Sequence, residues 1–329
     1  MERFKSNVLI YMYHNLLEGR VLVKKDILNR FDITERTFYR YLKDIQNFLH
    51  DPKSGFYLDN LKKHDYKKGY ILEYKHNNSL KEMEILAISK VLLESRGFIN
   101  EEIKGIIDKL LRYCIVEDKT KIHAIIDNEK NKYIEPKHGK SLVESLWTLS
   151  SAIQEKKVVC VSYRKIGKSG EISKESTRRE LIPMGILFSE YYFYLIAFIK
   201  GKNYKNPTIF RVDRMEDIYV TNDLIRESEA KSFEDGEFRK KIHFMQGGEE
   251  ELVTFKFKGE SIEAVLDKVD HISCTKCSDG SGYIIVTNTY RKGIKMWLLS
   301  QGDNVEVISP ISFREEMHET IISMLNSYK

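Results

Sequence analysis

The sequence predicts a multidomain α+β protein, because the spacing of its apolar residues changes several times along the chain. Residues 4–49 and 79–131 repeat apolar side chains at the interval of three to four residues that is typical of helices. Residues 157–220 instead contain short apolar runs separated by tight turns, which indicates strands. The last 80 or so residues mix both patterns, and 329 residues are enough for several separate cores.

The first 75 residues predict three short helices followed by a hairpin. Helical spacing covers residues 4–18 and 23–30, with Gly19 between them. Thr34 can cap a third helix, since a threonine hydroxyl accepts hydrogen bonds from first-turn N–H groups. The apolar residues of this third helix are Phe38, Leu42, Ile45 and Leu49. After Asp51-Pro52 the alternation changes to period two, so residues 56–74 predict a β-hairpin with a basic tip.

This order of elements predicts a winged helix-turn-helix domain over residues 1–75. The third helix would enter the major groove of duplex DNA, and the hairpin would hold the neighbouring phosphates. The residues expected to contact DNA are Thr34, Arg36, Thr37, Tyr39, Arg40 and Lys43 in the helix and Lys62, Lys63, Lys67 and Lys68 in the hairpin. The alternative is a solvated helix of an ordinary bundle. Agreement between the cap, the core spacing and the basic hairpin favours DNA binding.

The rest of the chain predicts a connector and two further modules. Residues 76–138 have helical spacing and no site chemistry, so we interpret them as a helical connector. A helix at 141–155 leads into predicted strands, which favour a small β-barrel or sandwich. Those strands are expected at residues 157–165, 178–189, 191–199 and 208–220. A charged linker then precedes a compact α+β module.

Positive charge is concentrated in two segments. The whole chain has a net charge of +5, residues 1–75 carry +5 and residues 141–222 carry +4, so the remainder is acidic. Uneven basic charge of this kind indicates two surfaces that could meet phosphates.

Five elements of the chain together resemble the WYL-domain transcriptional regulators of bacteria. The stretch ITERTFYRYLKDI is similar to the recognition helix of many bacterial repressors and activators. Phe193-Tyr194-Leu195 is a relaxed form of the tripeptide that names the family, and Arg179-x-x-x-Pro183 lies upstream of it. FRVDRMEDI, residues 210–218, is similar to the family's arginine-rich strand end. From LVTFKFKG through MWLLSQGDNVEVISPISFREEM, the chain resembles the WCX-type module that usually follows a WYL domain.

The resemblance implies a fold and a ligand for the second half of the chain. Residues 139–225 would form an Sm-like β-barrel that binds single-stranded DNA or a nucleotide, and residues 247–329 would mediate dimerisation. The residues themselves fit such a ligand, since arginines grip phosphates and tyrosines stack on bases. The expected ligand-binding residues are Tyr163, Arg179, Tyr194, Arg211 and Arg214. Alternatively, Tyr194 packs in the core and Arg214 pairs with the acidic residues of 213–217.

No motif in the sequence indicates a metal, a cofactor or catalysis. His271, Cys274 and Cys277 have zinc-like spacing, but a structural zinc site normally takes four ligands and no second pair is present. We interpret this stretch as a strand and turn with free thiols. Gly167-Lys168-Ser169 lacks the earlier glycine of a phosphate-binding loop and predicts a hairpin turn. The sequence therefore predicts a protein that is not an enzyme.

Composition also bears on location. The apolar run at residues 191–199 is far too short to span a bilayer, and no signal peptide is evident at the start. Four cysteines do not make a disulfide framework in a chain of this size, so a reducing cytoplasm is expected.

Together these observations predict a homodimeric, cytoplasmic DNA-binding regulator whose affinity for a double-stranded operator changes with an effector. The effector would be single-stranded DNA or a nucleotide. One alternative is a nucleic-acid-processing accessory factor or enzyme that uses the WYL barrel as its substrate site. Another is a structural DNA-binding protein without a ligand.

Overall fold

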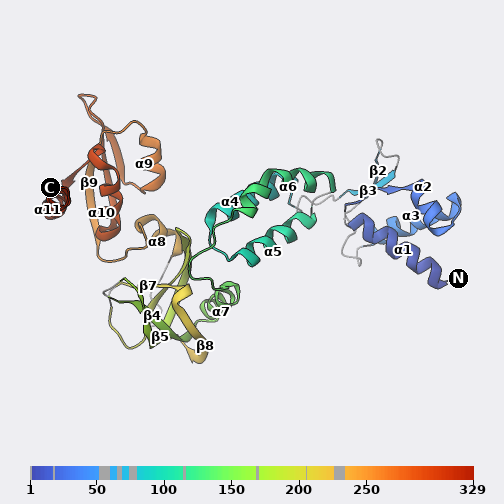
Figure 1. The fold of residues 1–329 in the computed structure, drawn as a ribbon, viewed down its shortest axis with the longest axis horizontal. Coiled ribbons are helices and arrows are strands. Elements are labelled where there is room, and N and C mark those ends of the chain that lie inside the picture. Colours follow the sequence, from blue (N-terminus) through green and yellow to red (C-terminus); the bar gives the residue numbers. More distant parts are fainter. Residues whose placement is uncertain are drawn as a thin grey trace. The chain divides into compact units, whose positions relative to one another are not determined.

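The computed structural model contains two compact units, residues 1–139 and 140–329, and each mixes helices with sheet (Figure 1). The predicted α+β class is therefore confirmed. No helix among the described residues is long and apolar enough to cross a bilayer. The structure describes residues 2–17, 19–51, 60–64, 69–73, 80–113, 116–167, 170–204, 206–225 and 234–329.

The N-terminal unit begins with three helices and a small sheet. The elements are α1 (Glu2–Leu17), β1 (Leu22–Val23), α2 (Lys24–Phe31), α3 (Glu35–Leu49), β2 (Asn60–His64) and β3 (Gly69–Glu73). The helices agree with the predicted ranges to within two residues, and β2 and β3 form the predicted hairpin. Strand β1 was not predicted; it pairs with β3 and gives the order β1-β3-β2. Gly69 permits this pairing, since a Cβ there would lie 2.6 Å from the Leu22 carbonyl oxygen.

The helical connector follows in the same unit. Its elements are α4 (Glu82–Ser95), α5 (Asn100–Leu110), a short 3₁₀ turn (Leu111–Tyr113) and α6 (Val116–Asn131). Fully buried isoleucines at 85, 103, 107 and 126 form a core separate from that of α1–α3. The connector therefore has the internal packing of a small helical bundle.

Five strands of the C-terminal unit form one antiparallel sheet after helix α7 (Val143–Gln154). They are β4 (Lys157–Ile166), β5 (Ile172–Ser189), β6 (Tyr192–Ile199), β7 (Thr208–Arg211) and β8 (Met215–Leu224). Their order is β7-β6-β5-β4-β8, so the last strand returns to pair with the first. The sequence predicted one strand over residues 208–220, and this was wrong because a 3₁₀ turn at Val212–Arg214 divides it.

This sheet is strongly curled, because its two edge strands are consecutive in the chain. β7 ends at Arg211 and β8 begins at Met215, and these four peptide steps span at most about 14 Å. A flat five-stranded sheet would hold its edges about 19 Å apart. The short link therefore draws the edges toward each other. The described pairings do not join β7 to β8, so hydrogen bonds do not close the predicted barrel here.

The two faces of the curled sheet have different neighbours. The α7 face carries Val161, Leu195 and Phe210, which pack with Leu149 of α7 in one core. Because side chains alternate along a strand, the residues between them point to the other face. That face carries Leu187 and Ile196, which pack against helix α8.

The remaining elements form the C-terminal module. They are α8 (Asp235–Lys241), β9 (Glu250–Phe257), α9 (Ile262–Lys268), β10 (Ser273–Lys276), β11 (Tyr283–Tyr290), α10 (Arg291–Ser300), a 3₁₀ turn (Gly302–Asn304), β12 (Val305–Ser309) and α11 (Ile311–Asn326). The sheet order is β10-β11-β9-β12. Phe255, Trp297 and Phe313 are central to its core, so α10 and α11 cover this sheet.

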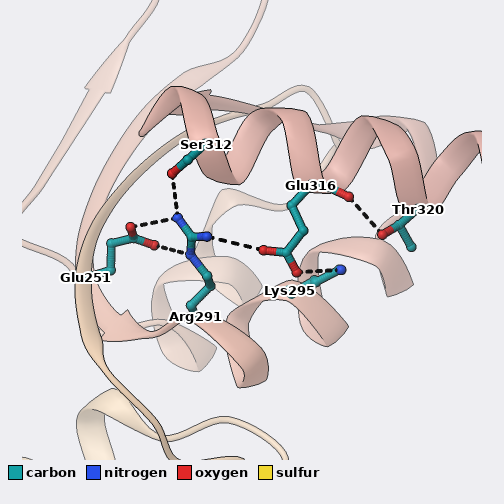
Figure 2. A network of polar contacts seen from close by, with 6 residues as sticks. All are labelled: Glu251, Arg291, Lys295, Ser312, Glu316 and Thr320. Carbon is teal, nitrogen blue, oxygen red and sulfur yellow. Dashed lines mark hydrogen bonds and ion pairs between the residues drawn. The ribbon is translucent and has the colours of Figure 1, made fainter.

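A network of charged side chains fastens α10 and α11 to β9 (Figure 2). Arg291 donates from Nε and a terminal nitrogen to both carboxylate oxygens of Glu251, at 2.6 and 2.8 Å. The same guanidinium reaches Ser312 and Glu316 of α11, and Lys295 completes the network at 2.6 Å from Glu316. Bidentate pairing of this kind fixes orientation as well as distance.

Helix α8 and the residues after it join the curled sheet to the C-terminal module. Phe238 and Ile242 pack with Leu187 and Ile196 of the sheet and with Tyr290 of β11. The next residue, His243, is 4% exposed.

The buried His243 predicts a loss of stability in acid. Burial, with a smaller contribution from the charge of Lys268, lowers the pKa of His243 from 6.5 to about 4. The unfolded chain therefore takes up this proton first as pH falls. The stabilisation is complete above pH 6.5 and is lost toward pH 4, by about 3 kcal/mol.

Tryptophan fluorescence can measure this, since both tryptophans, Trp147 and Trp297, belong to the C-terminal unit. Urea unfolding at pH 7 and pH 4.5 should show a larger loss for the natural chain than for a His243→Gln variant. Equal losses in the two proteins would contradict the assignment of this effect to His243.

Candidate nucleic-acid interface

Helix α3 starts at Glu35 because Thr34 caps it, as predicted. The Oγ1 of Thr34 accepts a hydrogen bond from the N–H of Thr37 at 3.3 Å, and the two hydroxyl oxygens lie 3.1 Å apart. One face of the helix is buried, and its residues are Phe38, Tyr41, Leu42, Ile45 and Leu49. The opposite face is therefore presented to solvent.

That exposed face carries Arg36, Tyr39, Arg40 and Lys43, four of the residues predicted to contact DNA. Tyr39 is 45% exposed, and the Arg40 guanidinium lies 5.4 Å from the ring of Tyr41. Within the described part of the chain, Arg36 and Lys43 form no ion pair. Their charges are free to meet a phosphate or a base edge.

An ion pair ties α2 to the start of α3. Lys24 Nζ lies 3.0 Å from Glu35 Oε1 and 5.7 Å from the centre of the Tyr39 ring. The hydrogen bond to Glu35 raises the pKa of Lys24, so this side chain stays charged beside the exposed face of α3. Lys24 was not among the predicted DNA contacts, because its proximity to α3 depends on how the two helices pack.

The hairpin contributes further positive charge. Lys62 and Lys63 are exposed on β2, opposite Ile71 and Tyr70 of β3. Since consecutive residues of a strand point to opposite faces, the two lysines extend to different sides of the hairpin. The other two predicted lysines, Lys67 and Lys68, lie outside the described residues.

A cavity of about 550 Å³ lies in the C-terminal unit, beside β4, β5, the β6–β7 loop, β7 and residues 248–249. Its volume is in the usual range for small-ligand sites. The lining includes Tyr163, Lys165, Arg179, Tyr204, Asn206 and Phe210. Asn206 donates to the Gly248 carbonyl oxygen at 2.5 Å, which holds one wall in place. Glu249 also lines the cavity, so its charged groups are two cations and one carboxylate. Together with the aromatic and amide groups, they suit an anionic ligand that carries a ring.

Two of the five predicted ligand residues, Tyr163 and Arg179, line this cavity. Tyr163 is 8% exposed, and its hydroxyl accepts a hydrogen bond from the Arg211 backbone N–H at 3.3 Å. Its ring contacts Phe210 edge-on, with centres 5.1 Å apart. Tyr163 therefore forms a fixed wall. Arg179 is half-buried and makes no ion pair with any described residue, so its charge is available to a ligand.

The other three, Tyr194, Arg211 and Arg214, are not among the lining residues. Arg211 is held by a bidentate ion pair with the buried Asp213, at 2.9 and 2.8 Å, and its guanidinium lies 3.3 Å from the Tyr192 ring centre. Burial lowers the pKa of Arg211, but the hydrogen bond and charge of Asp213 outweigh it, so that pKa is raised overall.

The side chains of Tyr194 and Arg214 are partly buried within the protein. Tyr194 packs against the α8 core, and burial raises the pKa of its hydroxyl. The Nε of Arg214 is buried and has no hydrogen-bond partner among the described residues. Neither side chain lies where the cavity would present it to a ligand.

The other lining residues were not predicted; they include the polar side chains of Lys165, Tyr204 and Asn206. Lys165 had a usable signal, because it lies two positions after Tyr163 on the same strand and so faces the same side. Tyr204 and Asn206 belong to a loop, where no periodicity indicates direction.

The residues with zinc-like spacing, His271, Cys274 and Cys277, do not form a compact set of ligands. Cys274 lies in β10 and Cys277 in the turn after it, and both are free thiols. Across the described residues, no group of three or more histidine, cysteine, aspartate or glutamate side chains could hold a metal ion.

Comparison with protein families decides the identity of the curled sheet. The family model of the WYL domain matches residues 144–220, which run from α7 to β8. The chain carries a WYL domain. The WCX domain model matches residues 249–325, from the start of β9 to the end of α11. The two domains together match a WYL-domain regulator, as the sequence resemblance implied.

Among solved structures, the chain is similar to "Proteasome accessory factor B/C (PafBC) of Arthrobacter aurescens", with 15% identity and a TM-score of 0.31. That match covers 98% of this chain and 49% of PafBC, so this chain spans about half the length of PafBC. A second similar structure is described as a CRISPR Cas-related protein, with 13% identity and a TM-score of 0.36. That match covers 88% of this chain and 86% of the other chain. Comparison with the curated proteins gave no match.

The cavity and the Arg211–Asp213 pair both belong to the WYL domain, apart from the wall at residues 248–249. Residues 248–249 lie where the WCX match begins. A ligand of the WYL domain would therefore contact the start of the next domain.

Proposed function

We propose that this protein is a transcriptional regulator that binds operator DNA through α3 and senses an effector through its WYL domain. The observation that carries the proposal is the exposed basic face of α3, with Arg36 and Arg40 directed away from a fully buried apolar face. A capped helix of this kind fits the major groove, where arginine can make a bidentate contact with guanine. Thr34, Thr37, Tyr39, Lys43 and the hairpin lysines would hold the neighbouring backbone.

The effector site is the WYL cavity. Lys165 and Arg179 supply positive charge there, and Tyr163 and Tyr204 supply rings on which a base could stack. This chemistry supports a nucleotide or a nucleic-acid strand as the effector. Tyr194, Arg211 and Arg214 would act indirectly, by fixing the edge strand β7 and the turn that follows it.

The domain plan of the proposal has four parts, residues 1–75, 76–138, 139–225 and 247–329. We propose that the last part joins two copies of the chain in the cytoplasm. The second half of α11 supports this, since Ile321, Met324 and Leu325 are about half exposed beyond the anchored first turns. Apolar side chains so placed are typical of contacts between subunits. Sedimentation velocity would measure the dimer, and a Leu325→Lys variant should dissociate it.

Effector control can be measured with a duplex that the protein itself selects from a random-sequence library. We expect an oligothymidylate of about 12 nucleotides to change the affinity for this duplex at least about fivefold. An Arg179→Ala variant should bind the duplex normally but lose the response. An unchanged affinity in the natural chain would remove the sensing part of the proposal. Breakdown of the oligonucleotide in the presence of Mg²⁺ would favour the alternative, a nucleic-acid-processing enzyme.

A further inference from the structure

The segment after α8 is part of the wall of the effector cavity. We call residues 243–251 the junction, because they run from the end of α8 into β9. Gly248 and Glu249 of this segment line the cavity. Gly247 lies against β7, since a Cβ at this position would be 3.3 Å from the Cδ1 of Ile209. A ligand in the cavity would therefore be in contact with the junction.

The backbone of the junction is strained. Phe244 and Met245 have φ angles of 50° and 52°, in the left-handed region that disfavours residues with a Cβ. The Nε2 of the preceding His243 is buried and has no hydrogen-bond partner among the described residues. Gly293 of α10 packs on the same segment, since a Cβ there would lie 2.4 Å from the His243 carbonyl oxygen. Strained backbone persists only where the surrounding packing holds it, and it is typical of segments that change conformation.

Two carboxylates attach the end of the junction to other elements. Glu250 accepts hydrogen bonds from Lys241 of α8 at 2.9 Å and from Asn288 of β11 at 3.2 Å. Glu251 accepts both of its bonds from Arg291 of α10, at 2.6 and 2.8 Å. Consecutive residues of a strand point to opposite faces, so a displacement of the cavity wall would act on both sides of the WCX sheet.

Helix α11 is attached to its sheet by two separate groups of charged residues. In the first, Arg291 donates to Ser312 at 2.7 Å and to Glu316 at 3.3 Å, as Figure 2 shows. In the second, Arg314 donates to Glu306 of β12 at 2.9 Å. The first group reaches the cavity wall through β9, whereas β12 supplies none of the residues that line the cavity. The first group alone therefore connects α11 to the cavity.

From these contacts we infer that the junction couples the effector cavity to α11, so that occupation of the cavity changes the stability of the dimer. The route runs from the wall at Glu249 through Glu251 and Arg291 to Glu316. The inference rests on the proposed function, in which the exposed second half of α11 joins two copies of the chain. Such a coupling is reciprocal, so dimer formation would change the affinity of the cavity by the same factor.

The test measures the dimer dissociation constant by sedimentation velocity, with and without a saturating oligothymidylate of about 12 nucleotides. We expect the oligonucleotide to change this constant at least about fivefold in the natural chain. In a Glu251→Gln variant the change should fall below about twofold, because a neutral amide cannot hold both bonds of the guanidinium. The affinity of the monomeric variant for the oligonucleotide, measured by fluorescence anisotropy, should stay within about twofold, since Glu251 does not line the cavity.

Two further variants make the test specific. A Glu306→Gln variant loses a carboxylate of the second group and should keep a change of at least about fourfold. An Arg291→Lys variant keeps the positive charge but cannot pair with Glu251 through two bonds, so it should lose the response. This second variant also tests the inference if Glu251→Gln fails to fold, which urea unfolding would show.

The outcomes separate this inference from the proposed function. If the oligonucleotide binds the natural chain and leaves the dimer dissociation constant unchanged, the coupling is wrong while the effector site stands. Equal loss of the response in Glu251→Gln and Glu306→Gln would also overturn it, because the response would then depend only on how firmly α11 is held. A natural chain that stays monomeric would remove the dimer and the coupling together. If no oligonucleotide binds, the effector site and the coupling are both wrong.

Discussion

Replacing Arg36 and Arg40 together by alanine is expected to lower the affinity for the selected duplex by at least about a hundredfold. Each bidentate arginine contact to a base contributes about 1–3 kcal/mol, and both side chains are exposed on the same side of α3. The fold should be retained, because neither side chain is part of the buried face of this helix. Electrophoretic mobility shift and fluorescence anisotropy at fixed salt concentration would measure the change.

A matched control is a Lys109→Ala/Lys292→Ala variant. It removes the same net charge from exposed positions in α5 and α10, outside the proposed interface. Its duplex affinity should stay within about threefold of the natural value, since it removes no proposed DNA contact. If the arginine variant and this control weaken binding equally, the effect is one of total charge, and α3 is not the reading helix.

Replacing Arg211 by alanine is expected to destabilise the C-terminal unit by about 3–5 kcal/mol. The change leaves the Asp213 carboxylate, whose side chain is 1% exposed, without its bidentate partner. It also removes the guanidinium that stacks on Tyr192 at the end of the sheet. Urea unfolding followed by tryptophan fluorescence would measure the loss, as both tryptophans belong to this unit.

Two further variants distinguish the loss of the Arg211–Asp213 ion pair from the loss of one positive charge. An Arg211→Ala/Asp213→Ala chain should recover part of the lost stability, because no buried charge is left unpaired. An Arg178→Ala chain loses an exposed arginine of the same sheet and should change the free energy of unfolding by less than about 0.5 kcal/mol. A small loss for Arg211→Ala would mean that Asp213 finds another partner or water. The pair would then not organise the turn between β7 and β8.

The N-terminal helices illustrate how much of the fold is local. Thr34 caps α3, and Phe38, Leu42, Ile45 and Leu49 are buried, as their spacing predicts. Both features depend on residues within one or two turns of each other. By contrast, β1 consists of two residues, and its pairing with β3 depends on Gly69 far along the chain. No local pattern indicates that contact.

The residues around the cavity of the WYL domain were harder to predict. Of the five residues predicted to bind a ligand, Tyr163 and Arg179 line the cavity, whereas Arg211 lies in a buried ion pair and Tyr194 packs toward α8. Consecutive residues of a strand point to opposite faces of the sheet. Phe210, the residue before Arg211, lies on the α7 face beside Tyr163, so Arg211 points to the other face. The arginine-rich motif therefore identifies the domain without showing which of its side chains meets a ligand.

Residue spacing, capping and motif by themselves determined the α+β class, the outward face of α3 and the presence of a WYL domain followed by a WCX domain. Only the tertiary structure decided the rest: the break at Val212–Arg214, the curl of the sheet and a cavity whose walls come from β4, β5, the β6–β7 loop, β7 and residues 248–249. The physical reason is the distance along the chain between the residues that determine each feature. Helix periodicity and caps arise between residues a few positions apart, whereas a cavity arises where the register of several strands brings distant residues together.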